Sequence, residues 1–124
     1  MFSHIMVGTN DLDRAKTFYD AVLGTLGVPP GFVDRHRVFW RTPTGVFAAS
    51  LPIDGQPATF GNGSTIGFAC ADAAQADAWH AAGVANGGTT CEDPPGVREG
   101  ANGKLYLAYL RDPDGNKLCG LVRM

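Results

Sequence analysis

The sequence predicts an α+β fold built from two tandem copies of one βαβββ module. Residues 4–27 align without gaps on residues 65–88, and Arg41-Thr-Pro-Thr-Gly45 matches Arg111-Asp-Pro-Asp-Gly115. The offset grows by nine residues between the two matches, so the second copy contains a longer loop. A repeat of about half the chain indicates two copies of one supersecondary unit, neither of which closes a core alone.

The first copy covers about residues 1–53 and begins with an alternating, strand-like pattern over residues 2–9. Asn10 or Asp11 is a suitable N-cap for the helix that follows. Residues 32–41 and 46–53 then have the composition of strands, joined by a turn at residues 42–45. The apolar face of the helix has the expected spacing and comprises Leu12, Ala15, Phe18, Tyr19, Val22 and Leu23.

A Gly- and Pro-containing linker at residues 54–63 separates the copies, and the second copy covers residues 64–124. We expect the first and last strands of each module to pair. The result is a curved mixed sheet, a half-barrel around a cleft, with the helices on its convex side. The predicted elements of the second copy are a strand at 64–71, a helix at 72–84, a short strand at 89–91, a long loop at 92–103 and a hairpin of 104–111 with 116–122.

Alternation along the strands assigns side chains to the two sheet faces. Ile5, Val7, Ile66 and Phe68 are expected to pack against the helices, and His4, Met6, Thr65 and Gly67 to face the cleft. If both hairpin loops have four residues, Val38 opposes Ala49 and Ala108 opposes Cys119, with Trp40, Phe47, Tyr106 and Leu121 on the same cleft face. A loop longer by one residue reverses such an assignment.

Composition limits the classes of partner. The 124 residues suit a single domain, with ten basic and twelve acidic residues, a net charge of −2 and no basic run, so neither nucleic acid nor an anionic membrane is an expected partner. No apolar run approaches the roughly 20 residues of a spanning helix. Cys70, Cys91 and Cys119 form no Cys-x-x-Cys pair, and no signal-peptide pattern is present, which favours the cytoplasm.

The repeat, the helix segment at residues 11–27 and the Arg111-Asp-Pro-Asp-Gly-Asn116 turn together resemble the vicinal oxygen chelate superfamily. That superfamily includes glyoxalase I, bleomycin-resistance proteins and extradiol dioxygenases, and the resemblance covers nearly the whole chain. The sequences of two loop segments are similar to those of a bacterial glyoxalase-like branch of this superfamily, namely Gly55-Gln-Pro-Ala and Pro95-Gly-Val-Arg98.

The resemblance implies four metal-ligand positions, one on the first and one on the last strand of each module. His4 matches the first position, whereas Ala49, Thr65 and Cys119 occupy the other three. A catalytic zinc site normally has three protein ligands, and magnesium or manganese requires oxygen ligands. We therefore expect either no cofactor or a weakly held divalent metal with His4 as its candidate ligand.

The candidate ligand-binding residues of the cleft are His4, Trp40, Phe47, Thr65, Arg98, Tyr106 and Cys119. For each, a structural role competes. For His4 the alternatives are a metal ligand, a hydrogen-bond partner of the ligand, or a strand residue without a functional role. For the three aromatic residues they are the walls of a site for a flat ligand or part of the ordinary hydrophobic core. For Arg98 the alternatives are a hydrogen bond to a ligand carboxylate or an ion pair with Glu99. For Cys119 they are a reactive thiol or a small apolar residue packed in the core. Asp112 and Asp114 are explained as turn formers.

The leading hypothesis is a glyoxalase-like protein that binds a small organic molecule in its cleft; whether it is an enzyme is left open. The first alternative is a metal-dependent lyase of the lactoylglutathione-lyase type, or a dioxygenase, in which His36, His80 or Glu99 completes a site with His4. The second alternative is a non-catalytic interaction module. We expect a homodimer, because exposed sheet edges are usually paired or covered and two-fold dimers are common.

Overall fold

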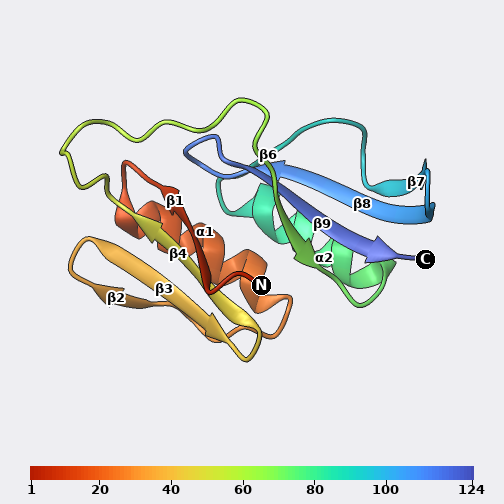
Figure 1. The fold of residues 1–124 in the computed structure, drawn as a ribbon, viewed down its shortest axis with the longest axis horizontal. Helices are drawn as coiled ribbons and strands as arrows, with labels where there is room; N and C mark the ends of the chain where they lie inside the picture. The colour runs from red at the N-terminus through yellow and green to blue at the C-terminus, as the bar shows by residue number, and fades with distance from the viewer.

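The computed structural model describes all 124 residues as two mixed sheets of four and five strands with two helices, and the sheets are not closed into a barrel (Figure 1). This confirms the predicted α+β fold. Module one consists of β1 (His4–Gly8), α1 (Leu12–Gly24), β2 (Phe32–Asp34), β3 (Arg37–Thr42) and β4 (Gly45–Ser50). Module two consists of β5 (Ile66–Ala69), α2 (Ala73–Ala85), β6 (Thr89–Thr90), β7 (Gly96–Gly100), β8 (Gly103–Arg111) and β9 (Lys117–Arg123).

In each module the first and last strands pair, as predicted, and the structure shows that the pairing is parallel. The strand order is β1-β4-β3-β2 in module one and β5-β9-β8-β6 in module two, where β7 also pairs with β8. β1 and β5 are therefore the edge strands at which the two sheets meet without pairing. Figure 1 shows α1 and α2 behind their respective sheets, and the two helices contact each other.

Aspartates cap both helices: Asp11 is one of the two predicted candidates, and Asp72 is the residue at which the second helix was expected to start. The Asp11 side chain accepts the N–H of Arg14 at 3.0 Å, and the Asp72 side chain accepts the N–H of Gln75 at 2.8 Å. Each such cap typically stabilises a helix by about 1 kcal/mol. The predicted apolar stripe of α1 is buried at Ala15, Phe18, Tyr19, Val22 and Leu23.

A continuous aromatic core joins the modules. Tyr19 contacts Trp40 and Phe47 at ring-centroid distances of 5.4 and 4.7 Å. Phe47 then contacts Phe68 of module two at 5.4 Å, and Phe68 contacts Trp79 of α2 at 6.2 Å. Ile5, Val7, Ile66 and Phe68 pack against this core, as their alternation predicted.

Two predicted segments contain more strand than expected. Residues 32–41 form not one strand but the β2–β3 hairpin, because Arg35 adopts a φ of 55° and turns the chain back. The loop at residues 92–103 contains β7, in which Val97 pairs with Tyr106 of β8. The extra residues of module two therefore extend its sheet.

The predicted register is correct in the first module and wrong in the second. Val38 does oppose Ala49, but Ala108 opposes Gly120, and Cys119 opposes Tyr109. The second hairpin loop has five residues, because Arg111 pairs with Lys117 and encloses residues 112–116. The added residue reverses the relation between the faces of β8 and β9.

The predicted cleft-facing aromatics lie on the helix side instead. Phe47 pairs with Ile5, which faces α1, so the two side chains share that face. Trp40 opposes Phe47 and is 1% exposed. Tyr106 also points to its helix, where its hydroxyl donates to Asp77 Oδ1 at 2.6 Å. Parallel pairing with the first strand therefore decides the face of every later strand in each module.

Candidate ligand-binding site

The boundary between β1 and β5, which we call the seam, contains a cavity at each end. The larger one, the seam pocket, has a volume of about 510 Å³ and lies where the start of β1 meets the end of β5. Of its 18 lining residues, 12 are hydrophobic, so the pocket is an apolar cavity between the modules. The smaller cavity, near Gly8 and Ile66, has a volume of about 360 Å³ and is mainly polar.

The walls of the seam pocket are apolar side chains from both modules. Trp40 and Phe47 of module one line it together with Ile66 and Phe68 of module two. The indole N–H of Trp40 is not available to a ligand, because it donates to Asp20 Oδ1 at 2.9 Å. Trp40 therefore presents only its ring.

The negative charge of Asp20 is compensated by groups outside the pocket. It pairs with Lys16 at 2.6 Å and accepts the N–H of Gly31 at 2.8 Å. Burial raises the pKa of Asp20, but the hydrogen bonds from Lys16, Gly31 and Trp40 together outweigh it and hold that pKa below its usual value. The carboxylate thus stays ionised and anchors the indole from behind.

The rim of the pocket supplies a few hydrogen-bonding groups. Ser3 Oγ lies 2.7 Å from His4 Nδ1. Thr42 Oγ1 donates to the carbonyl of Gly45 at 2.9 Å and accepts the N–H of Thr44 at 3.2 Å. No lysine, arginine, aspartate or glutamate lines the pocket, so its chemistry is that of an apolar chamber with a polar edge.

Three of the seven predicted site residues line this pocket, namely His4, Trp40 and Phe47. Thr65 immediately precedes the lining residues Ile66 and Gly67. Arg98 lies apart from the pocket, and its guanidinium donates to the backbone carbonyls of Asp93 and Pro94 at 3.0 and 2.9 Å. It therefore holds its own loop, and it forms no ion pair with Glu99.

Tyr106 and Cys119 also lie outside the pocket. Cys119 is 5% exposed on the sheet face opposite α2, beside Gly67. Burial raises the pKa of the Cys119 thiol, and burial likewise raises that of Cys70. Both thiols therefore stay protonated near neutral pH, which makes them weak nucleophiles.

The side chains present do not fit a divalent metal. No group of three or more His, Cys, Asp or Glu side chains is arranged to hold an ion, and His80 instead bonds the hydroxyl of Thr90 at 3.0 Å. His4 lies opposite Val46. Ala49, near the predicted ligand position on β4, pairs with Val7 on the helix side, and the open-face neighbours Val46 and Ala48 cannot be ligands either.

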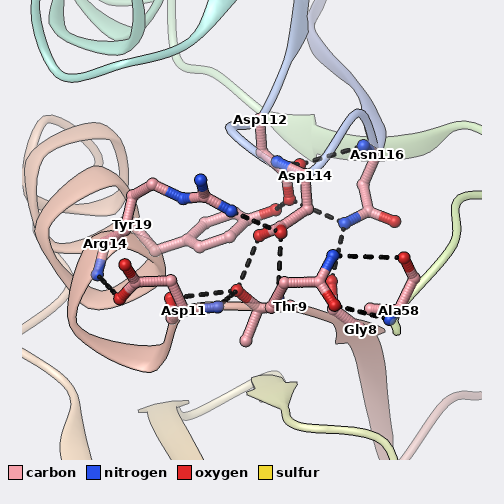
Figure 2. A network of polar contacts seen from close by, with 10 residues as sticks. Gly8, Thr9, Asp11, Arg14, Tyr19, Ala58, Asp112, Asp114 and Asn116 are labelled. Carbon is pink, nitrogen blue, oxygen red and sulfur yellow. Dashed lines mark hydrogen bonds and ion pairs between the residues drawn. The ribbon is translucent and has the colours of Figure 1, made fainter. Parts of the chain in front are cut away.

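A polar network joins the modules at the opposite end of the seam, beside the smaller cavity (Figure 2). Asp112 is 4% exposed, and its Oδ1 accepts the backbone N–H groups of Asp114 and Asn116 at 2.9 Å each. Its Oδ2 accepts the hydroxyl of Tyr19 at 2.5 Å and the side-chain amide of Asn116 at 2.9 Å. Burial raises the pKa of Tyr19 well above its usual value, and the charge of Asp112 raises it further.

Asp114 extends the network to the start of α1. It accepts the Thr9 hydroxyl at 2.6 Å, the Asn10 N–H at 2.9 Å and an Arg14 guanidinium N–H at 2.7 Å (Figure 2). We call these residues the inter-module lock: Thr9, Asn10, Arg14 and Tyr19 with Asp112, Asp114 and Asn116. The prediction that Asx turns explain Asp112 and Asp114 fully is therefore wrong, because both also bind module one.

One sequence signal distinguishes the lock. The internal repeat places threonines, Thr42 and Thr44, where the second copy has Asp112 and Asp114. A turn alone is satisfied by either residue type, so two carboxylates in one copy indicate partners outside the turn.

The chain belongs to the Glyoxalase/Bleomycin resistance protein/Dioxygenase superfamily, whose family model matches residues 1–119. A glyoxalase/bleomycin resistance protein from Albidiferax ferrireducens T118 is 66% identical, with a TM-score of 0.97 over 98% of both chains. A glyoxalase-related enzyme from Fulvimarina pelagi is 20% identical, with a TM-score of 0.75 over 99% of this chain and 88% of that one.

A lactoylglutathione lyase from Agrobacterium tumefaciens has the same fold at 22% identity, with a TM-score of 0.67 over 98% of this chain and 92% of that one. Comparison with curated proteins gave no match. Neither helix of the structure is long and apolar enough to cross a membrane.

Proposed function

We propose that this protein binds a small organic molecule in the seam pocket through its own side chains. The observation that carries the proposal is the apolar cavity of about 510 Å³ between the modules. Ligand sites in proteins are typically apolar cavities of about 300–1,000 Å³ with a few polar groups. His4, Trp40 and Phe47, which the sequence had marked as ligand contacts, line it.

Metal-dependent lyase chemistry is the weaker alternative. A glyoxalase I reaction requires a metal-bound enediolate and a nearby carboxylate base. The seam pocket has no carboxylate among its lining residues, and His4 has no second ligand beside it. The residues of this chain thus support binding better than lyase catalysis.

We further propose that the protein is a cytoplasmic homodimer. Its three cysteines are free, which suits a reducing compartment. The edge strand β2 carries Phe32 and Val33, which are 44% and 54% exposed, and such edges are usually covered. Light scattering at micromolar concentration tests this: a mass near the 13.0 kDa of one chain would refute the dimer.

Filling the pocket tests the ligand proposal. A Cβ built on Gly67 meets nothing within 4 Å, so the backbone there accepts a side chain, and Gly67→Leu adds one to the pocket lining. We expect binding of naphthalene, measured by isothermal titration calorimetry, to weaken by at least about tenfold, a loss of about 1.4 kcal/mol.

Gly24→Leu is the matched control, because a Cβ there also meets nothing within 4 Å and Gly24 does not line the pocket. Its affinity for naphthalene should equal that of the wild type. Equal binding by the Gly67 variant would place the ligand elsewhere, and failure of naphthalene and of a wider panel of aromatic metabolites to bind the wild type would overturn the proposal.

A further inference from the structure

We propose that the ligand of the seam pocket is an uncharged aromatic molecule that carries one hydroxyl-type group, and that His4 Nε2 holds this group with Ser3 as the positioning residue. This inference rests on the proposed function and names the chemical class of its ligand. It follows from the charges around the pocket and from the polar atoms that remain free at its rim.

No lysine, arginine, aspartate or glutamate side chain offers a counter-charge to a ligand in the seam pocket, because none of its 18 lining residues is of these types. The carboxylate of Asp20, behind Trp40, is already engaged by Lys16. Burying a charge without a partner is strongly unfavourable, so the pocket selects against carboxylates and ammonium groups.

The polar atoms of the rim are mostly committed to the protein itself. The Trp40 N–H is bonded to Asp20, and the Thr42 hydroxyl is bonded within its own turn. The Thr44 hydroxyl lies 3.2 Å from that of Thr42. His4 is different, because Ser3 engages only its Nδ1 and leaves Nε2 without a protein partner.

The Ser3–His4 contact leaves His4 Nε2 as either a donor or an acceptor, depending on the tautomer of the ring. If Ser3 donates to Nδ1, the neutral ring carries its proton on Nε2 and donates to the ligand. If Nδ1 donates to Ser3, Nε2 is the acceptor. A hydroxyl both donates and accepts, so it satisfies either tautomer, whereas a carboxylate satisfies only the first.

Three ligands with one ring system separate these contributions: naphthalene, 1-naphthol and 1-naphthoate, each titrated calorimetrically at pH 8. We expect wild-type protein to bind 1-naphthol about tenfold more tightly than naphthalene, which corresponds to one hydrogen bond. We expect 1-naphthoate to bind at least about tenfold more weakly than 1-naphthol, because its charge is unpaired in the pocket.

Variants then assign the hydroxyl contact. His4→Ala should reduce 1-naphthol affinity to that of naphthalene and leave naphthalene binding unchanged. Ser3→Ala should weaken 1-naphthol binding by a smaller factor, again without affecting naphthalene. His80→Ala is the matched control, because His80 bonds Thr90 and does not line the pocket, and both affinities should stay at the wild-type level.

The outcomes distinguish this inference from the proposed function. Binding of 1-naphthoate as tight as that of 1-naphthol would overturn the ligand class while leaving the pocket established. Equal loss of naphthalene and 1-naphthol affinity in His4→Ala would show that His4 acts as a wall and would overturn its polar role. If no ligand of the series binds, the proposed function fails, and this inference fails with it.

Discussion

The turns at residues 42–45 and 112–116 occupy equivalent positions in the internal repeat, but only the second one bonds to the other module. The second turn lies against α1 and fastens the modules through the inter-module lock. The first turn contacts no polar group of module two and borders the seam pocket. One end of the seam is thus joined by polar bonds, and the other contains the larger, apolar cavity.

The side-chain type at the first turn position explains the difference. The Thr42 hydroxyl has one proton and uses its bonds on Thr44 and Gly45 of its own turn. The Asp112 carboxylate has two oxygens, so one satisfies the turn while the other bonds Tyr19. The threonine side chain therefore makes its hydrogen bonds within its own turn, whereas the aspartate side chain keeps an acceptor oxygen for a residue of the other module.

The helix residues of the two modules differ in the same way: those of α1 bond to the second turn, whereas their counterparts in α2 have other partners. His80 occupies the repeat position of Tyr19, but it bonds Thr90 within module two. Gln75 occupies the position of Arg14, and its amide donates to the Thr25 carbonyl at 3.1 Å. Neither residue reaches the turn at 42–45.

The largest effect is expected for Asp112→Ala. The change leaves the Tyr19 hydroxyl and two backbone N–H groups without their acceptor. We expect a loss of about 3 kcal/mol or more in the free energy of unfolding, because each buried unsatisfied donor costs about 1–3 kcal/mol. Urea denaturation measures this. Thr42→Ala, at the equivalent exposed turn, should cost less than about 1 kcal/mol, and equal losses would contradict the comparison.

Asp114→Ala is expected to destabilise the protein less, by about 2 kcal/mol, because its partners Asn10 and Arg14 are partly solvated and regain water. Urea denaturation again provides the measurement, with Thr44→Ala as the matched change in the other turn. That control should stay within about 0.5 kcal/mol of wild type. If both variants are neutral, Asp114 is no part of a lock.

Tyr19→Phe should cost about 1–2 kcal/mol near neutral pH, because Asp112 loses one bond but keeps Asn116. The pKa of Tyr19 is raised in the folded state above its ordinary value of 10.0, chiefly by burial. A raised folded pKa means that the stability from Tyr19 is fully present below pH 10 and is lost as pH rises further. The wild-type advantage over Tyr19→Phe, followed by denaturation from pH 7 to 11, should therefore shrink only above about pH 10.

The smallest change in stability is expected for the double variant Thr42→Asp with Thr44→Asp, which gives the first turn the Asp-Pro-Asp-Gly sequence of residues 112–115. Because Gln75 and His80 are engaged elsewhere, the new carboxylates have no partner, and stability should change by less than about 0.5 kcal/mol. A stabilisation above 1 kcal/mol, measured by thermal unfolding, would show that aspartates alone create a lock.

Local sequence was sufficient for the two-module plan and for the helices. The caps Asp11 and Asp72 and the inward direction of Ile5 and Val7 follow from contiguous patterns, since helix periodicity and strand alternation are properties of neighbouring residues. Alternation also predicted that His4 faces away from the helices, and His4 lines the seam pocket. Such features need no knowledge of distant contacts.

Tertiary structure decided the register of the second hairpin, the direction of Trp40 and the difference between the two ends of the seam. A single residue, Asn116, extends the second loop and reverses the faces that alternation had assigned. The lock joins Tyr19 to Asp112, which are 93 residues apart in the sequence. The seam pocket lies between two sheets that are not hydrogen-bonded to each other. Its size depends on the distance between the modules, and the sequence pattern of either module alone does not determine that distance.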